Sequence, residues 1–300
     1  MPEQPDRRPF TESNAARALA VASCEAGLDA SGAQLIRMGE NAIYSLPREA
    51  VVARIARSAS LADRVLREVE VADWLAGHDF PAVRSAPDVK QGIEADGRLV
   101  TFWQLVAVTG EEPSVAALGH LLHDLHELPA PPFALPTFYP FSVVPSRLDH
   151  PGPAPAADVA FLRSRYEALL ADYQALDFAS PFGFIHGDAH RGNILMSPAG
   201  PLLSDFETVA CGPREWDLTP TAMSVERFGL SVQDYAAFTH AYGADVRDSS
   251  VYPVLREIRE ITMTTWLMQL YQVSEQHAAE FRLLMDSLRE GDHGRLWHAA

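Results

Sequence analysis

Residues 182–207 read FGFIHGDAHRGNILMSPAGPLLSDFE, and this stretch decides the fold. Two short, largely apolar runs, 194–196 and 202–204, flank the turn-forming segment 197–201. This pattern predicts a β-hairpin, because turn formers separate two runs that are suited to strands. The residues just outside antiparallel strands face each other, so we expect Asn193 and Asp205 to lie side by side at the open end.

Asn193 and Asp205 offer an amide oxygen and a carboxylate, which are hard ligands that suit Mg²⁺ and not zinc. Asp188, five residues before Asn193, can accept a hydrogen bond from an attacking hydroxyl and align it with a phosphoryl group. His190 can place a donor or a positive charge on that phosphoryl. The competing interpretation is that Asp and Asn serve here only as turn formers.

The pattern H-G-D-x-H-x-x-N, with D-F-E beginning twelve residues after the Asn, resembles the catalytic and metal-binding motifs of the aminoglycoside phosphotransferase family. Protein kinases also set the Asp and Asn of their catalytic loop five residues apart. The resemblance implies that Asp188 is the catalytic base, that Asn193 and Asp205 hold magnesium, and that His186 supports the loop. It also implies an α+β, bilobal protein-kinase-like fold, with a small antiparallel sheet and one helix before a larger helical lobe.

Upstream residues follow the order of that family. The resemblance implies a covering hairpin, a strand cation with its helix carboxylate, and a hinge whose backbone meets a purine, with these residues binding the nucleotide: Asn41, Arg54, Glu68, Gln104, Leu105 and Val106. Glu68 lies on the apolar stripe of its predicted helix and therefore needs a partner, which Arg54 would supply. Arg54 replaces the usual lysine, so a planar fork replaces a compact ammonium group.

Three further polar features remain. Asp217, in the segment GPREWDL, is similar to the aspartate that anchors the catalytic loop from behind, with capping of a helix as the alternative. Glu207 either reaches a metal or is a solvated turn residue. His120, His123 and His126 recur every three residues, but this spacing turns around a helix, so a structural role for His126 is favoured over a metal site.

The remaining pattern predicts a sheet followed by helices. The predicted strands are 35–38, 42–46, 51–55 and 99–106, and the predicted helices are 14–27, 61–76 capped by Ser60, 115–125, 159–176, 252–274 and 276–289. Residues 1–12 are expected to be a loose tail, and the proline-rich stretch 129–155 an irregular excursion. We expect a nucleotide-covering lobe over 1–105 and a helical lobe with the catalytic loop and acceptor site over 106–300.

The composition narrows the partners, the metal sites and the cellular location that we expect for the chain. The 300 residues carry a net charge of −16, which disfavours a nucleic-acid partner and is compatible with a cationic small molecule. Two distant cysteines predict neither a disulfide framework nor a thiolate zinc site. Without a long apolar run or a secretory signal at the start, we expect a cytoplasmic protein with no membrane partner.

These observations predict a Mg²⁺-dependent phosphotransferase that uses ATP or GTP to phosphorylate a hydroxyl of a small molecule. The acceptors that the resemblance implies are of several kinds, and among them an aminoglycoside or other antibiotic, phosphorylated for resistance or self-protection, is the preferred hypothesis. A choline, homoserine or sugar kinase of the same fold is the alternative. A metallophosphoesterase and a nucleotide-binding pseudokinase are more distant ones, and the helical second half does not offer the ligands that the former needs.

Overall fold

The computed structural model of the chain describes residues 10–39, 41–58, 61–179 and 182–298. It divides into two compact units: the first contains Met1–Pro113 and Gly192–Thr208, and the second contains Ser114–Arg191 and Val209–Ala300. The sequence-based division at residue 105 placed the hairpin with the helical lobe, whereas the hairpin clusters with the first unit. The predicted cap Ser60 and residues 1–9 of the predicted tail lie outside the described residues.

The first unit is built on a five-stranded antiparallel sheet with the order β1-β2-β3-β5-β4. The strands are β1 (Gln34–Met38), β2 (Asn41–Leu46), β3 (Val51–Ala56), β4 (Ile93–Ala95) and β5 (Arg98–Gln104). All four predicted strands are confirmed, with β5 ending two residues early. Strand β4 was missed because three residues are too few to show a period of two.

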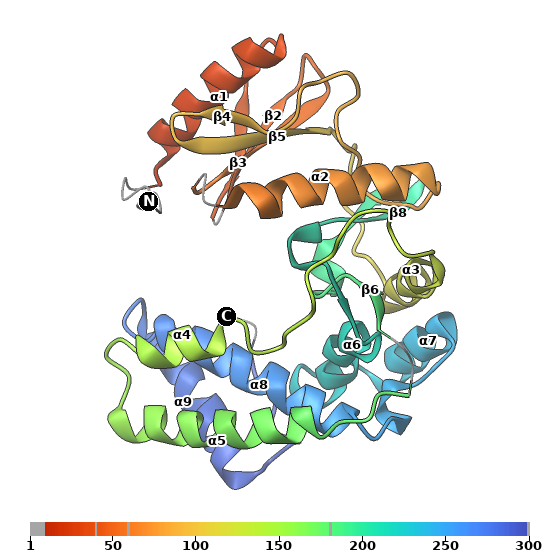
Figure 1. The fold of residues 1–300 in the computed structure, drawn as a ribbon. Helices are drawn as coiled ribbons and strands as arrows, with labels where there is room; N and C mark the ends of the chain where they lie inside the picture. Colours follow the sequence, from red (N-terminus) through yellow and green to blue (C-terminus); the bar gives the residue numbers. More distant parts are fainter. Residues whose placement is uncertain (1–9, 40, 59–60, 180–181, 299–300) are drawn as a thin grey trace. The chain divides into compact units, whose positions relative to one another are not determined.

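Two helices accompany this sheet, α1 (Glu12–Ala26) and α2 (Ala62–Gly77), as Figure 1 shows. Successive side chains of a strand point to opposite faces. Ala53 and Ile55 of β3 accordingly pack in one core with α1, while Val52 packs in a separate cluster with α2. Arg54 shares the face of Val52, and its contact with Glu68 of α2 follows from this alternation. Helix α1 ends at Gly27, whose φ of 73° is a left-handed conformation that suits glycine.

The predicted hairpin is present as β7 (Ile194–Ser197) and β8 (Gly200–Leu203), with Ile194 opposite Leu203. Leu203 joins the hairpin to the rest of the first unit through two backbone hydrogen bonds. Its N–H donates to the carbonyl of Pro81 (3.0 Å), and its own carbonyl accepts from Val83 (2.9 Å). These bonds form an isolated bridge between residues far apart in the sequence, while the hairpin remains a sheet of its own.

The second unit is mostly helical. Its helices are α3 (Val115–Glu127), α4 (Val144–Asp149), α5 (Ala156–Gln174), α6 (Glu215–Arg227), α7 (Val232–Tyr242), α8 (Tyr252–Gln269) and α9 (Glu275–Glu290). A two-stranded sheet joins β6 (Gly183–Ile185) to β9 (Ala210–Gly212). The four helices predicted here are confirmed. The stretch 129–155 contains the short helix α4, so its description as wholly irregular was wrong. Helices α6 and α7 and the short strands β6 and β9 were missed, although a helix near Asp217 was weighed as an alternative.

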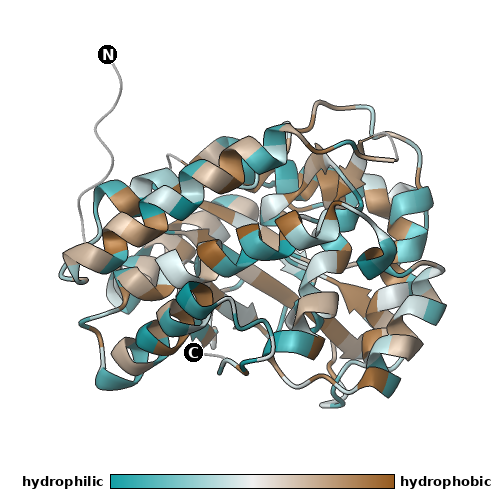
Figure 2. Ribbon diagram, turned by 90° about the horizontal axis from the view of Figure 1, so that it is seen from below, coloured by the Kyte–Doolittle hydropathy of each residue, from teal (hydrophilic) through white to brown (hydrophobic). Residues whose placement is uncertain are grey.

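Close packing of helices shapes this unit. Helices α3 and α7 lie side by side in Figure 1, and a Cβ at Gly119 would come within 2.6 Å of the Phe238 carbonyl oxygen. Only glycine allows that approach. A second core joins α5, α8 and α9 through buried side chains such as Leu162, Ile258 and Phe281. Figure 2 shows hydrophobic and hydrophilic residues alternating along the helices, as one-sided burial requires. Among the described residues, no helix combines the length and apolarity needed to cross a membrane.

Candidate active site

A buried aspartate fixes the loop that follows β6. Asp217, in the first turn of α6, is fully buried and accepts the backbone N–H groups of His186 (2.7 Å) and Gly187 (2.8 Å). Burial by itself would raise the pKa of Asp217, but hydrogen bonding and charge from His126, with help from His186, hold the pKa below its ordinary value. An ionised carboxylate therefore holds the loop, as an anchor in this position was predicted to do.

His126 links this aspartate to α7. Its Nε2 lies 3.1 Å from Asp217 Oδ2, and its Nδ1 lies 2.9 Å from the hydroxyl of Tyr242. His123 instead contacts the carbonyl of Tyr242 at 3.0 Å. Neighbouring histidines of α3 therefore bind different groups, and the structural interpretation of His126 is confirmed.

Asp188 lies at the exposed side of the same loop. Its side chain is 48% exposed, with Arg259 Nη1 3.3 Å from Oδ1 and His190 Nε2 3.6 Å from Oδ2. Partial burial would raise the pKa of Asp188, but the hydrogen bond from His190 and the charge of Arg259 lower it to about 2. Asp188 is thus an anion at neutral pH, able to accept a hydrogen bond.

His186 is completely buried, and its Nδ1 accepts the backbone N–H of Asp188 at 3.3 Å. The imidazole therefore braces the turn from inside and is not available to a ligand. This position agrees with the supporting role expected for His186, while His190, whose side chain is 48% exposed, is the accessible histidine of the loop.

The open end of the hairpin brings the predicted metal ligands to adjacent positions in the first unit. Ser204 donates its backbone N–H to the carbonyl of Asn193 at 2.9 Å, so Asn193 and Asp205 flank the same end. Asn193 is buried, whereas the side chain of Asp205 is 48% exposed. Asp205 has a φ of 67°, a left-handed conformation that aspartate tolerates better than most residues.

The predicted cation and carboxylate pair is present. Arg54 Nη1 of β3 contacts Glu68 Oε2 of α2, and Arg54 Nη2 lies 3.7 Å from Asp205 Oδ1. Glu68 is only 3% exposed. Burial raises the pKa of Glu68 to about 7, because the charge of Arg54 offsets only part of the desolvation and Asp205 adds a like charge. This buried carboxylate contacts the guanidinium of Arg54 from one side.

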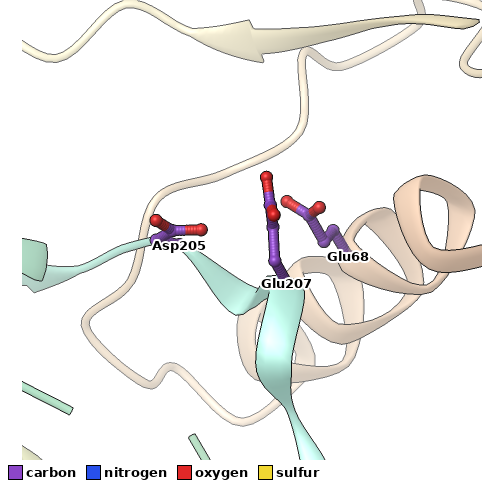
Figure 3. A group of neighbouring side chains, drawn as sticks. All are labelled: Glu68, Asp205 and Glu207. Atoms are coloured by element: carbon purple, nitrogen blue, oxygen red, sulfur yellow. The ribbon is translucent and has the colours of Figure 1, made fainter. Parts of the chain in front are cut away.

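Glu207 is neither a solvated turn residue nor a free ligand. It pairs with both Arg54 and Arg64, and it accepts a hydrogen bond from Asn41 Nδ2 at 2.6 Å. Figure 3 shows Glu68, Asp205 and Glu207 gathered together, and their oxygens lie within 4.8 Å of one another. Arg54 contacts all three carboxylates, and Asp205, the most distant of them from Arg54, is the exposed one.

The predicted hinge uses part of its backbone internally. The N–H of Gln104 donates to the carbonyl of Arg84 (2.9 Å), and that of Leu105 to the carbonyl of Ala50 (2.8 Å). A cavity of about 280 Å³ borders Gln104, Leu105 and Val106. Its other walls are the loop at 82–84 and the hairpin turn, not the strands β1 and β2 that were expected to cover a nucleotide. We therefore do not identify it with the purine site.

Sequence reasoning missed Arg64 and Arg259. Each lies on a helix outside any recognisable motif, and each becomes informative only through a partner distant in sequence, Glu207 or Asp188. The spacing of apolar residues along α2 or α8 could not have revealed either partner.

The fold is shared with kinases of small molecules. An amicoumacin kinase, hAmiN, in complex with AMP-PNP, Ca²⁺ and Ami, has a TM-score of 0.70 at 14% identity, covering 94% of this chain and 96% of its own. A microcompartment-associated aminopropanol kinase gives 0.66 at 18% identity, covering 92% and 98%. The aminoglycoside phosphotransferase APH(3'')-Id of Streptomyces rimosus gives 0.58 at 16%, covering 84% and 99%. None of the curated protein sequences matches the chain significantly.

The α+β architecture is thus that of the protein-kinase-like fold. Residues 41–258 match the model of the Phosphotransferase enzyme family (APH), so the chain belongs to this family and is a small-molecule phosphotransferase. The match spans strands β2 to β5 of the sheet, the loop that carries Asp188, the hairpin and the first seven residues of α8. The metallophosphoesterase alternative is accordingly set aside.

Proposed function

We propose that this chain transfers the γ-phosphoryl group of a magnesium-bound ATP or GTP to a hydroxyl of an antibiotic or related secondary metabolite. The observation that carries the proposal is Asp188, an ionised and accessible carboxylate on a loop fixed from behind by Asp217. Such a group accepts the hydrogen bond of an acceptor hydroxyl and orients its oxygen. Phosphoryl transfer asks mainly for positioning and charge stabilisation, so a weak base is sufficient.

The proposed metal ligands fit Mg²⁺ by their chemistry. Asn193 and Asp205 bring an amide oxygen and a carboxylate to one hairpin end, and Mg²⁺ prefers hard oxygen donors and retains several waters. Magnesium, when bound with the nucleotide, would neutralise phosphate oxygens. Asp188 and Asn193 are five residues apart, so the chain limits their separation to about 18 Å. We propose that they serve the same phosphoryl group.

The remaining residues take supporting roles in this proposal. Arg54, oriented by Glu68, presents a guanidinium to the α- and β-phosphates, and Asn41 steadies the network through Glu207. His190 donates to the transferred phosphoryl group. Backbone carbonyl groups of the hinge 104–106 contact the purine, since two of its amides are used within the protein.

The acceptor is proposed from the neighbours and from charge. One solved neighbour is an amicoumacin kinase and another an aminopropanol kinase, so an antibiotic and a small amino alcohol are the two candidates. The net charge of −16 tolerates a cationic acceptor. The carboxylates of α8 do not favour a polycation, because Glu257 pairs with Arg165 and Glu260 with Arg227. We therefore prefer an acceptor with few amines, in the cytoplasm where nucleoside triphosphates are abundant.

A screen of purified protein with MgATP and MgGTP tests the proposal. The acceptors are amicoumacin, aminoglycosides, aminopropanol, choline, homoserine and simple sugars, and product is detected by ³¹P NMR and mass spectrometry. Asp188→Asn should lower kcat by roughly 10²- to 10⁴-fold, since it removes the carboxylate that orients the hydroxyl. Asp172→Asn, an equal change of charge on an exposed face of α5, is the matched control and should leave kcat unchanged.

Two results would contradict the proposal. Acceptor-dependent turnover that persists undiminished in Asp188→Asn would remove this residue from the chemistry. Full activity in excess chelator would show that the reaction does not need a metal. The same measurement is made on Asp205→Asn, which we expect to raise the Mg²⁺ concentration needed for half-maximal activity.

A further inference from the structure

Arg259 of α8 contacts the catalytic loop at two points. Its Nη1 lies 3.3 Å from Asp188 Oδ1, and its Nη2 donates to the carbonyl of Gly187 at 3.0 Å. The arginine side chain is only 13% exposed. Arg259 is therefore buried and contacts both the Asp188 carboxylate and the carbonyl of the preceding residue. This position allows it to control the orientation of the Asp188 carboxylate.

Trp216 of α6 holds this arginine from a third side. The Arg259 guanidinium lies 3.9 Å from the centre of the Trp216 ring, and the indole N–H donates to the same Gly187 carbonyl at 2.8 Å. Gly187 therefore accepts from both side chains while its N–H donates to Asp217. Stacking and two hydrogen bonds leave the planar fork of Arg259 little freedom to turn, which an ammonium group could not reproduce.

We infer that Arg259 is a positioning residue that fixes the carboxylate of Asp188 in the orientation needed to receive the acceptor hydroxyl. The inference rests on the proposed role of Asp188 as the base. It assigns to α8 a part in the reaction that no sequence motif indicates. His190, near the other carboxylate oxygen, belongs to the loop itself and has a side chain that is 48% exposed, whereas Arg259 comes from a packed helix and is 13% exposed.

The charges around Asp188 give this arrangement a measurable signature. The groups that face it are Arg259 from α8 and His190 and His186 from the loop, while Asp217 of α6 acts on Arg259 from behind. The pKa of Asp188 is lowered to about 2, so its ionised form persists until the pH falls toward that value. Loss of Arg259 should move the pKa up toward the ordinary aspartate value of about 4.

The test compares Arg259→Met and Arg259→Lys with Arg256→Met. Arg256 lies one turn earlier on α8, is similarly buried at 11% exposed, and pairs with Glu226, so it matches Arg259 in packing and charge but not in its contact with the loop. The Asp188 carboxyl pKa is read by ¹³C NMR of the full chain, assigned with Asp188→Asn. Affinity for a fluorescent ATP analogue and kcat for the best acceptor are measured beside it.

Arg259→Met should raise the Asp188 pKa and lower kcat by about 10²-fold, as expected for a misoriented catalytic group, without changing nucleotide affinity. Arg259→Lys should keep a low pKa but lose roughly tenfold in kcat, because it retains charge without the fork. Arg256→Met should leave both readouts at their wild-type values. If Arg259→Met fails to fold, the lysine variant decides.

A wild-type kcat in Arg259→Lys, or an unchanged Asp188 pKa and kcat in a folded Arg259→Met, would overturn the inference. The failure of the proposed function looks different, because there Asp188→Asn itself would leave turnover intact. Should no acceptor be found, the NMR measurement still decides whether Arg259 acts on Asp188.

Discussion

Each unit contains an arginine and a carboxylate held together, but the two pairs are built with opposite polarity. In the first unit the carboxylate is the deeper partner: Glu68 is 3% exposed and contacts Arg54, which is 16% exposed. In the second unit the arginine is the deeper partner: Arg259 is 13% exposed and contacts Asp188, which is 48% exposed. The more exposed member of the pair is thus the arginine in the first unit and the carboxylate in the second.

The difference follows from what each unit is proposed to bind. Phosphates require a cation, and a hydroxyl that must be aligned requires an acceptor, so the buried partner in each pair serves to hold the one that works. A buried ion pair adds little to stability, since desolvation offsets the Coulomb attraction. Its value here is a fixed orientation, and removal of the buried partner should affect function more specifically than removal of a surface charge.

Loss of Asp217, which holds the loop that carries Asp188, should have the largest effect on stability. Asp217→Ala leaves the amides of His186 and Gly187 and the ring of His126 without their common acceptor. Unsatisfied buried donors cost about 1–3 kcal/mol each, so the free energy of unfolding should fall by about 3–5 kcal/mol. Urea denaturation followed by circular dichroism measures it, with Asp172→Ala as control. A loss below about 1 kcal/mol would show that the loop does not depend on this anchor.

Removal of the buried partner in the first pair should weaken nucleotide binding moderately. The pKa of Glu68 is about 7, so the comparison is made at pH 8, where the carboxylate is mostly ionised. There Glu68→Gln removes a charge that contacts Arg54, and a charge-assisted hydrogen bond contributes about 1.5 kcal/mol or more, so nucleotide affinity should fall roughly tenfold. The dissociation constant of a fluorescent ATP analogue reports this change. The Asp188 pKa should stay at its wild-type value, and a shift of that pKa in Glu68→Gln would show that the two pairs are not independent.

Replacement of Arg54, the cation proposed to contact the phosphates, by lysine should have the smallest effect on nucleotide affinity. Arg54→Lys keeps the positive charge and restores the residue usual in this family, but an ammonium group cannot face Glu68 and Glu207 as a planar fork does. We expect nucleotide affinity to change only about threefold, in ATP and GTP alike. Titration with both nucleotides checks this expectation. A much larger loss for one of them would make Arg54 a determinant of nucleotide choice.

Local signals were sufficient for much of the fold. The hairpin could be predicted because turn formers separate two runs of strand-like residues, and the alternation along β3 put Arg54 on the face that α2 covers. The short strands β4, β6 and β9 and the helices α6 and α7 were missed, because none of them carries enough regularly spaced apolar residues to show a period. Helix α4 was missed because the many prolines around it predict irregular structure. The proline of α4 itself lies in the first turn, where a helix tolerates it.

The amino-acid sequence by itself determined the motif residues Asp188, Asn193 and Asp205 and the pairing of Arg54 with Glu68, because each depends on neighbours close in the chain or on the order of a recognisable pattern. Only the tertiary structure decided that Glu207 is clamped by two arginines and that Arg259 meets Asp188. Those contacts join residues 71 and more positions apart. The spacing of apolar residues indicates which face of a helix is buried, but it does not indicate which residues that face will contact.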